Sequence, residues 1–426
     1  MQSWPAPSVP SLPSGGLAPE LKDTASGTFV QPVDAGPALL YVCGITPYDS
    51  THLGHAATYV AFDTLVRTWR DAGLGVRYVQ NITDIDDPLL ERAEATGVDW
   101  RELAASQVQL FTTDMAALRV IPPDHYIGVV EAVDLVADGV QRMVQRQAAY
   151  RVPVSEGEPA PEGTTPGTRF DIYADMSADE RVGSLSGLDE ATMDIYFAER
   201  GGDPEREGKR HRRDPLLWRA ARAGEPWFDG GPLGPGRPGW HVECSVIAEQ
   251  YLGTPIHLQG GGTDLIYPHH EMSISHLRVL TQSPEPARAY LHTGLVAFEG
   301  HKMSKSRGNL VFVSRLVTDG VPAAAVRLTA LAHHYTEDWE YTDAELSERI
   351  AQLHRWQAAA GDDGGADLPA RSGTAVLADL RAALSQDLNT PRAVAIIDDW
   401  AAAPGTPADI ALVTDAVDAL LGIDLR

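Results

Sequence analysis

The chain has 426 residues, of which 43% are hydrophobic, which is enough for a substantial buried core in two or three domains. Its formal net charge of -25 at pH 7 opposes a polyanionic partner unless basic residues cluster locally. The opening MQSWPAPSVPSLPSGGLAPE lacks the features of a secretory signal, and no apolar run approaches about 18 residues, so we expect a cytoplasmic protein without membrane contact.

The first predicted strand covers 38–44 and follows a leader at 1–36 that is rich in proline and glycine. It ends in the loop ITPYDST, and apolar residues at three- and four-residue steps then predict a helix over 54–71. The apolar stretch 75–83 predicts a second strand. A strand, helix and strand in this order favour a parallel sheet with a right-handed crossover, which places the fold in the α/β class.

A helix is expected next, with Asp87 as its N-cap and Pro88 at its first helical position. The acidic residues here, Asp84, Asp86 and Asp87, are interpreted as caps and turn formers rather than as metal ligands. The pattern over 99–151 is mainly helical.

The stretch 155–167 has the composition of a linker, and the central sheet is expected to resume at 256–259 and to continue through 294–298. Beyond Trp339, segments rich in alanine and leucine predict a helical bundle. The predicted division is a leader at 1–36, the first half of the sheet domain at 37–109, a connective insertion at 110–236, the second half at 237–312, and a linker with the C-terminal helical bundle at 313–426.

One basic run stands out from the acidic background of the chain. It is EREGKRHRR at 205–213, with Arg206, Lys209, Arg210, His211, Arg212 and Arg213. A like-charge run of this kind is usually a solvated surface loop, and a local groove for nucleic acid is the alternative.

The tetrapeptide HLGH lies at the predicted turn from strand to helix, where backbone N–H groups and the helix dipole favour phosphate. His52 and His55 can donate hydrogen bonds to phosphate oxygens, and Gly54 allows a ribose or adenine to approach the backbone. The alternative for this motif is a pair of helix-capping histidines.

The loop KMSKS carries the ammonium groups of Lys302 and Lys305. These charges can neutralise the pyrophosphate leaving group during attack at the α-phosphorus of ATP. An exposed basic loop is the alternative, and the presence of HLGH upstream in one α/β chain weakens it.

Together, HLGH and KMSKS resemble the signature pair of class I aminoacyl-tRNA synthetases. The strings TPYDSTHLGHAATYVAFDTLVR, YVQNITDIDDPLLERA, RDPLLWRAARAGEPWF, GRPGWHVECS, GGGTDLIYPHHE and DLNTPRAV extend the resemblance to cysteinyl-tRNA synthetases over about residues 20–400. The resemblance implies a class I synthetase-type Rossmann-like parallel sheet with an inserted connective domain. It also implies that L-cysteine is activated by ATP with accompanying Mg²⁺, with His52, His55, Lys302 and Lys305 as catalytic residues.

The chain has only two cysteines, Cys43 and Cys244, which is too few for a disulfide framework. They lie far apart and outside any CxxC pair, so two buried thiols are the alternative to a metal site. The resemblance to cysteinyl-tRNA synthetases implies that Cys43, Cys244 and His269 hold zinc, which would bind the substrate thiolate. Serine would be rejected because its hydroxyl is a poor zinc ligand.

The synthetases have a fourth ligand, a glutamate, four residues after the histidine ligand, where this chain has Ser273. A three-ligand site is therefore expected. His270 and Glu271 are candidates for contacts around the ligands.

The resemblance also implies a pocket for ATP and cysteine. Thr46 and Asn81 suit hydrogen bonds to the amine or carboxylate of cysteine, Trp240 suits the wall of the thiol pocket, and Asp264 suits the ribose hydroxyls. Thr58 could instead be only a helix residue, and Trp240 only a core residue. The residues expected to bind the substrates are Cys43, Gly44, Ile45, Thr46, Thr58, Asn81, Ile82, Thr83, Trp240, Gly262, Thr263, Asp264 and Val296.

The chain departs from the synthetases in having QGGG at 259–262, Pro88 where lysine is common, and few residues after the first terminal helices. These departures, with the opening MQSWPAPSVPSLP, ERGGDP at 199–204 and Ser273, resemble the cysteine ligases of mycothiol biosynthesis. The resemblance implies that the amine of glucosaminyl-inositol accepts the cysteinyl group, that AMP and diphosphate are released, and that tRNA is not a partner. We expect a monomer.

The base that deprotonates the acceptor amine is not determined by the sequence, and His55, Asp264 and solvent are the candidates. A truncated cysteinyl-tRNA synthetase is the alternative function. An alternative of another class is a non-catalytic regulator that binds nucleotide or zinc.

Overall fold

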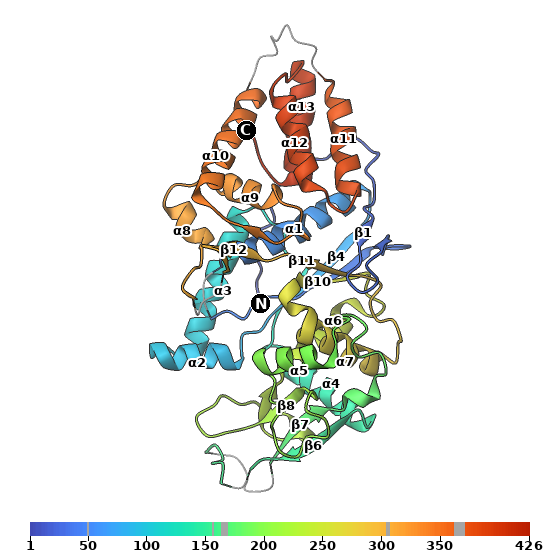
Figure 1. The fold of residues 1–426 in the computed structure, drawn as a ribbon, viewed down its shortest axis with the longest axis vertical. Coiled ribbons are helices and arrows are strands. Elements are labelled where there is room, and N and C mark those ends of the chain that lie inside the picture. Colours follow the sequence, from blue (N-terminus) through green and yellow to red (C-terminus); the bar gives the residue numbers. More distant parts are fainter. Residues whose placement is uncertain (49–50, 156, 163–168, 304–306, 362–370) are drawn as a thin grey trace.

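A five-stranded parallel sheet forms the centre of the molecule (Figure 1). The computed structural model describes residues 1–48, 51–155, 157–162, 169–303, 307–361 and 371–426. The strands of the sheet are β3 (Ala38–Val42), β4 (Val76–Ile82), β5 (His125–Gly128), β10 (Leu258–Gly262) and β11 (Tyr290–Thr293). Their order is β11-β10-β3-β4-β5, and all neighbours are parallel, which confirms the predicted α/β class.

Helix α1 (Leu53–Asp71) follows β3 and begins at the HLGH motif. His52 is its N-cap, and the His52 Nδ1 atom accepts a hydrogen bond from the Gly54 N–H at 3.1 Å. Gly73 lies just past the end of the helix with a φ of 81°, a left-handed conformation that ends helices. The predicted helix over 54–71 is therefore confirmed.

Successive side chains of β3 point to opposite faces of the sheet. Leu40 and Val42 pack in the core cluster that contains α1, whereas Tyr41 and Cys43 pack against the helices on the other face. Those helices are α6 (Trp240–Leu252) and α7 (Glu271–Thr281). This alternation places Cys43 on the same face of the sheet as Cys244.

Two helices follow β4, namely α2 (Asp87–Thr96) and α3 (Trp100–Ala117). The N-cap of α2 is Asp86 rather than the predicted Asp87, and its Oδ1 accepts a hydrogen bond from the Asp87 N–H at 2.8 Å. Pro88 is tolerated in the first turn because the N–H groups there have no intrahelical partner.

A second sheet lies at the end of the molecule opposite the C-terminal helices (Figure 1). Its elements are β6 (Ala149–Pro153), β7 (Phe170–Ala174), β8 (Leu216–Ala220) and β9 (Gly236–Pro238), with α4 (Val133–Gln145) and α5 (Glu190–Glu199) packed nearby. The strands are antiparallel in the order β6-β7-β8-β9.

The boundaries of this insertion differ from the predicted range 110–236. The predicted range contains β5, yet β5 pairs with β4 in the central sheet, so the insertion begins after Gly128. The range 99–151 is likewise not mainly helical, since it includes β5 and the start of β6. Short apolar runs such as these cannot be assigned to helix or strand by periodicity alone.

The stretch 294–298 was expected in the central sheet, but β12 (Val296–Phe298) belongs to a separate three-stranded sheet. It pairs with β13 (His301–Lys302) and β14 (Trp339–Glu340). The central sheet ends at β11 instead. The sequence of β11, YLHT, is short and half polar, so it lacks the apolar pattern of a buried strand.

The C-terminal region is helical, as predicted. Its helices are α8 (Val313–Thr318), α9 (Ala323–Leu331), α10 (Asp343–Ala360), α11 (Gly373–Ser385), α12 (Thr390–Ala401) and α13 (Pro407–Ala416). Their buried residues belong to the same core cluster as α1. The bundle and the central sheet therefore share one continuous core.

A buried ionic network joins α1 to this bundle. The Asp63 carboxylate accepts a hydrogen bond from Arg67 Nε at 2.7 Å and also pairs with Arg327 on α9. Arg67 Nη1 donates to the Asp418 carbonyl at 2.9 Å, and Arg327 Nε donates to the Leu421 carbonyl at 2.6 Å. The chain end thus satisfies charges that are buried beneath α1.

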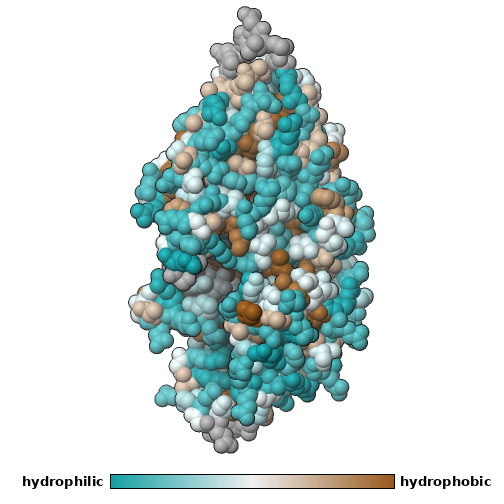
Figure 2. All heavy atoms as spheres, viewed as in Figure 1, coloured by the Kyte–Doolittle hydropathy of each residue, from teal (hydrophilic) through white to brown (hydrophobic). Residues whose placement is uncertain are grey.

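The face in Figure 2 is mainly hydrophilic, with hydrophobic residues scattered over it. Across the described residues, every helix is too short or too polar to serve as a membrane span.

Candidate active site

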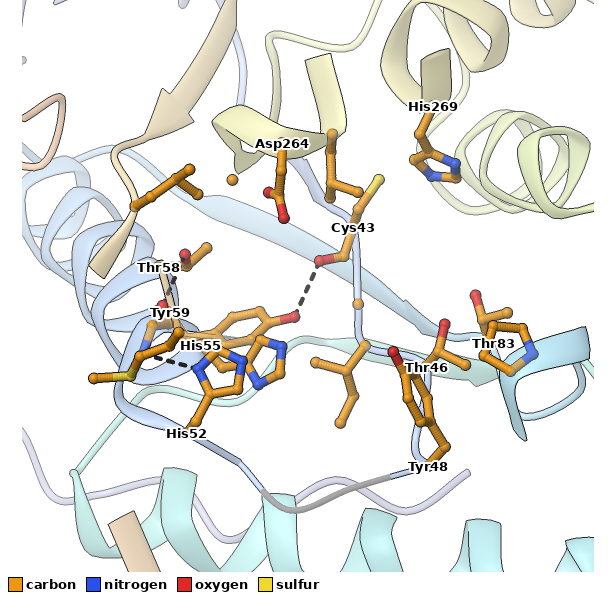
Figure 3. Close-up of a pocket in the computed structure, with 18 of the residues that line it drawn as sticks. Cys43, Thr46, Tyr48, His52, His55, Thr58, Tyr59, Thr83, Asp264 and His269 are labelled. Carbon is orange, nitrogen blue, oxygen red and sulfur yellow. Dashed lines mark hydrogen bonds between the residues drawn. The ribbon is translucent and has the colours of Figure 1, made fainter. Parts of the chain in front are cut away.

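A cavity of about 810 Å³ opens at the carboxyl ends of β3, β4 and β10, the edge where parallel sheets commonly bind ligands. In Figure 3 the HLGH histidines lie on one side, Thr46, Tyr48 and Thr83 lie on the other, and Cys43 lies between them. The predicted residues that line it are Cys43, Gly44, Ile45, Thr46, His52, His55, Thr58, Asn81, Thr83, Trp240, Gly262, Asp264, His269, Val296 and Lys302.

Some predicted residues are not part of the cavity wall. Ile82 is fully buried in the core beneath α1, and Thr263 does not line the cavity although its neighbours do. Cys244 lies behind the wall, where it contacts Cys43. Lys305 lies outside the described residues.

Other lining residues were not predicted as site residues: Tyr48, Tyr59, Pro88, Glu91, Arg92, Leu265, Gly294, Leu295 and Met303. Tyr59 could have been found, because it lies four residues after His55 on one helix face, and its hydroxyl donates to the Cys43 carbonyl at 3.1 Å. The sequence around α2 does not indicate that its residues line the cavity, because this depends on how the helix is oriented against the sheet.

Two cysteines and a histidine meet at the middle of the cavity, where Cys43 and His269 line the wall and Cys244 lies behind it. Cys43 follows β3, Cys244 is on α6, and His269 comes just before α7. Their ligand atoms all lie within 4.8 Å of one another, with 3.7 Å between the two sulfur atoms and 3.3 Å between Cys244 Sγ and His269 Nε2. The structure therefore brings together the three predicted ligands.

The chemistry of this donor set fits zinc. Two sulfurs and one imidazole nitrogen are ligands that zinc prefers, and three protein ligands leave a tetrahedral position for a substrate. Burial lowers the pKa of His269 well below its usual value, so the ring is neutral and able to ligate. Burial raises the pKa of the Cys43 thiol, and a nearby cation would be needed to hold it as a thiolate.

Aromatic rings contact two of the three donors, His269 and Cys43. The His269 ring stacks on Trp240 with 4.4 Å between ring centroids, and its Nδ1 lies 3.0 Å from His241 Nδ1. His270 Nε2 lies 3.1 Å from Cys43 Sγ, and His270 Nδ1 lies 2.7 Å from His292 Nε2. His270 therefore contacts a donor, as expected.

The predicted contact of Glu271 with the donors is not found, and Ser273 hydrogen-bonds elsewhere. The Glu271 carboxylate accepts from the Ser186 N–H at 2.8 Å, so it anchors the insertion rather than the donors. Ser273 Oγ donates to the His270 carbonyl at 3.2 Å and accepts from Gln259 Nε2 at 3.1 Å. Among the described residues, the donor cluster consists of Cys43, Cys244 and His269 and contains no carboxylate.

The backbone after β3 approaches β4 very closely at Gly44. A Cβ atom at this position would lie 1.6 Å from the Asn81 carbonyl oxygen, so a side chain is impossible here. Asn81 Oδ1 accepts from the Gly44 N–H at 3.0 Å and from the Tyr41 hydroxyl at 3.1 Å. Asn81 thus fixes the loop that carries Cys43.

The nucleotide end of the cavity contains the stacked rings of His52 and His55, with 3.9 Å between their centroids. Because His52 Nδ1 accepts from the Gly54 N–H, the proton of the neutral ring is on Nε2, which can donate to a phosphate oxygen. Across the cavity, Lys302 Nζ pairs with Asp264 Oδ2 at 2.9 Å. Lys302, the first residue of KMSKS, is therefore held against the residue expected to bind ribose.

ERGGDP, at the end of α5, supplies a link between the insertion and this wall. Arg200 Nη1 donates to the Asp264 carbonyl at 2.7 Å and also to the Tyr267 carbonyl. The Asp264 carbonyl precedes the turn Ile266–His270, and the Tyr267 carbonyl lies within this turn, which also contains His269. One guanidinium therefore positions both the nucleotide wall and a donor of the cluster.

The basic run at 205–213 is paired with acidic residues. Arg212 pairs with Asp194 at 2.8 Å and with Glu205 at 2.9 Å, and Lys209 pairs with Asp203 at 2.8 Å. These pairs favour the interpretation as a surface loop over a nucleic-acid groove.

The chain belongs to the class I tRNA synthetases: the family model described as "tRNA synthetases class I (C) catalytic domain" matches residues 29–351. Two relatives are each named L-cysteine:1D-myo-inositol 2-amino-2-deoxy-alpha-D-glucopyranoside ligase. The protein from Beutenbergia cavernae is 57% identical and covers 100% of both chains. The protein from Cellulomonas flavigena is 55% identical and covers 99% of this chain and 100% of its own length. The predicted relationship to synthetases and to these ligases is confirmed.

Solved structures share the fold. Methionyl-tRNA synthetase of Mycobacterium tuberculosis bound by methionyl-adenylate has a TM-score of 0.62 at 18% identity and covers 91% of this chain and 92% of its own. The agnB2 LeuRS of Agrobacterium radiobacter K84, in a ternary complex with tRNA and LeuAMS, has a TM-score of 0.62 at 12% identity and covers 92% of this chain and 84% of its own. The class I synthetase-type architecture is confirmed.

Proposed function

We propose that this protein is an ATP-dependent ligase that adenylates L-cysteine and transfers the cysteinyl group to the amine of glucosaminyl-inositol. One observation carries the proposal: the cluster of Cys43, Cys244 and His269 adjoins the same cavity as the HLGH histidines. Full-length similarity to ligases whose name specifies L-cysteine and this amino sugar supports the choice of both substrates.

Cysteine selection depends on the sulfur-rich cluster. Cys43, Cys244 and His269 would hold zinc, which when bound supplies a positive centre for the substrate thiolate. A serine hydroxyl would bind there poorly, so selection could be achieved without an editing step. Trp240 stacks on His269 and forms part of the wall on this side of the cavity.

Adenylation joins a cysteine carboxylate oxygen to the α-phosphorus of ATP and releases diphosphate. His52 Nε2 donates to a phosphate oxygen, and Lys302 leaves Asp264 to neutralise the leaving group, while Asp264 binds the ribose hydroxyls. Mg²⁺ accompanies ATP. Lys305, outside the described residues, is assigned to the same neutralisation through the KMSKS resemblance.

In the second step the acceptor nitrogen attacks the carbonyl carbon, the bond to AMP breaks, and the nitrogen loses a proton. The amine nitrogen must be neutral when it attacks, so a base or solvent takes its proton.

The test supplies ATP, Mg²⁺ and L-cysteine to the full chain and compares glucosaminyl-inositol with tRNA as acceptors. The expected result is cysteine-dependent exchange of diphosphate into ATP, together with amide and AMP formation from the amino sugar. Charging of tRNA without amide formation would instead assign a cysteinyl-tRNA synthetase. Absence of the exchange reaction would favour a non-catalytic regulator.

A further inference from the structure

We propose that the cavity end formed by Tyr48, Thr83, Pro88, Glu91 and Arg92, here called the α2 end, binds the polyhydroxylated amine acceptor. The inference rests on the proposed function, because it assigns a place to the second substrate of that reaction. All five residues line the cavity, and three of them belong to the first two turns of α2.

The order of groups along the cavity determines which end is open to the acceptor. His52 and His55 lie at the nucleotide end, Cys43 lies in the middle, and Tyr48 and Thr83 lie at the far end (Figure 3). In a cysteinyl adenylate the AMP occupies the nucleotide end, and the side chain of cysteine reaches the sulfur-rich cluster. The amine must therefore approach the carbonyl carbon from the α2 end.

The size of the cavity fits three groups held at once. Its volume of about 810 Å³ lies near the upper part of the range of about 300–1,000 Å³ that is usual for small-molecule sites. An adenylate that fills the nucleotide end and the middle would leave the α2 end for the acceptor.

The side chains of the α2 end match the chemistry of an amino sugar joined to a cyclic polyol. The Glu91 carboxylate can accept hydrogen bonds from hydroxyl groups, and the Arg92 guanidinium can donate to their oxygens. Tyr48 offers an aromatic ring to the apolar C–H face of a sugar.

The α2 end is held in place before any acceptor binds. The Asp86 side chain caps α2, and Asp87 forms an ion pair with Arg237, whose side chain is buried. Arg237 lies three residues before Trp240, so this pair ties α2 to the start of α6. A wall fixed in this way reduces the ordering cost of binding a flexible polyol.

The test uses Glu91→Ala in the full chain and measures the two half-reactions separately. The KM for glucosaminyl-inositol should rise about 10- to 100-fold, the loss expected for a hydrogen bond to a charged group. Cysteine-dependent exchange of diphosphate into ATP should be unchanged, because the nucleotide end and the cluster are untouched. Glu94→Ala is the matched control, since Glu94 is an exposed glutamate of the same helix outside the cavity.

A KM for the acceptor that stays normal in both Glu91→Ala and Arg92→Ala would overturn the α2 end as the acceptor site. So would a parallel fall of exchange and amide formation, which would place Glu91 in adenylation. A wild-type enzyme that carries out exchange but forms no amide from this amine would overturn the proposed function itself.

Discussion

Cys43 and Cys244 lie 201 residues apart in the sequence, and their sulfur atoms lie 3.7 Å apart in the structure. Neither residue could form a metal site through local spacing. Gly44 and Asn81 bring the first thiol to the edge of the sheet, and α6 brings the second, so the cluster depends on the whole Rossmann-like domain.

Replacing Cys244 with serine tests the cluster with almost no change in side-chain size. We expect Cys244→Ser to lose its zinc and to lower cysteine-dependent exchange. The loss should exceed the factor of about 10 to 100 that is typical when a residue that contacts a metal ligand is removed. Metal analysis and the exchange assay check this. Ser245→Ala, at the next buried position of α6, should keep the zinc. Full exchange by a metal-free preparation would contradict the zinc assignment.

Asp114 on α3 makes stability depend on pH. Burial raises its pKa to about 7, and among the described residues its Oδ2 atom has no hydrogen-bond partner. The folded state therefore keeps a proton that the unfolded state releases near pH 4. The contribution of this proton to the free energy of unfolding is present at low pH and is lost as pH rises through about 7.

The isosteric variant Asp114→Asn removes this titration. Its free energy of unfolding, relative to wild type, should increase by about 2–3 kcal/mol between pH 5 and pH 8. Denaturant unfolding at the two pH values measures the difference. A difference that does not change with pH would show that Asp114 has an ordinary pKa in the folded protein.

At the scale of elements, the sequence predicts those whose pattern is local. The strand before HLGH, the helix over 54–71 and the strand that follows are recovered, because apolar periodicity and turn residues specify them. The strands HYIG and YLHT are missed, since their place in the sheet is set by pairing with distant strands. The ligand set and most of the pocket could be inferred only through resemblance, and the α2 wall could not be inferred at all.

Arg200 connects the end of α5 to the turn that contains His269, so its loss should affect the binding of both ATP and cysteine. Arg200→Ala frees the carbonyls of Asp264 and Tyr267, and we expect kcat/KM for adenylation to fall about 10- to 100-fold, with weaker zinc retention against a chelator. Arg212→Ala is the control, because Arg212 belongs to the same insertion but forms only surface ion pairs. Normal zinc retention in Arg200→Ala would show that the arginine does not position His269.

At the scale of the whole molecule, the C-terminal bundle completes the burial of α1. Arg327→Met would remove one of the two arginines that pair with Asp63 and would remove a donor from the Leu421 carbonyl. We expect the free energy of unfolding to fall by about 3–5 kcal/mol, as for other broken buried ion pairs. Exchange activity measured well below the unfolding temperature should persist, because none of these groups lines the cavity.

Denaturant unfolding measures this loss against Arg315→Met, a control at an exposed arginine of α8. The pair between Arg315 and Asp319 is 3.7 Å long and solvent-exposed, so its removal should change stability by less than about 1 kcal/mol. Equal effects of the two substitutions would show that the buried network adds nothing beyond a surface pair.

The position of β10 between β3 and β11 also affects how the chain is made. The ribosome synthesises β3 long before β10. Until β10 emerges, the edge of β3 that pairs with β10 in the finished sheet has no hydrogen-bonding neighbour. In the part of the chain that the structure describes, the four strands of the insertion pair with one another and not with the central sheet, so they can form during that interval. The nascent protein should therefore pass through a stage with a finished insertion, an open strand edge and an incomplete cavity, the stage at which strand-edge aggregation is most probable.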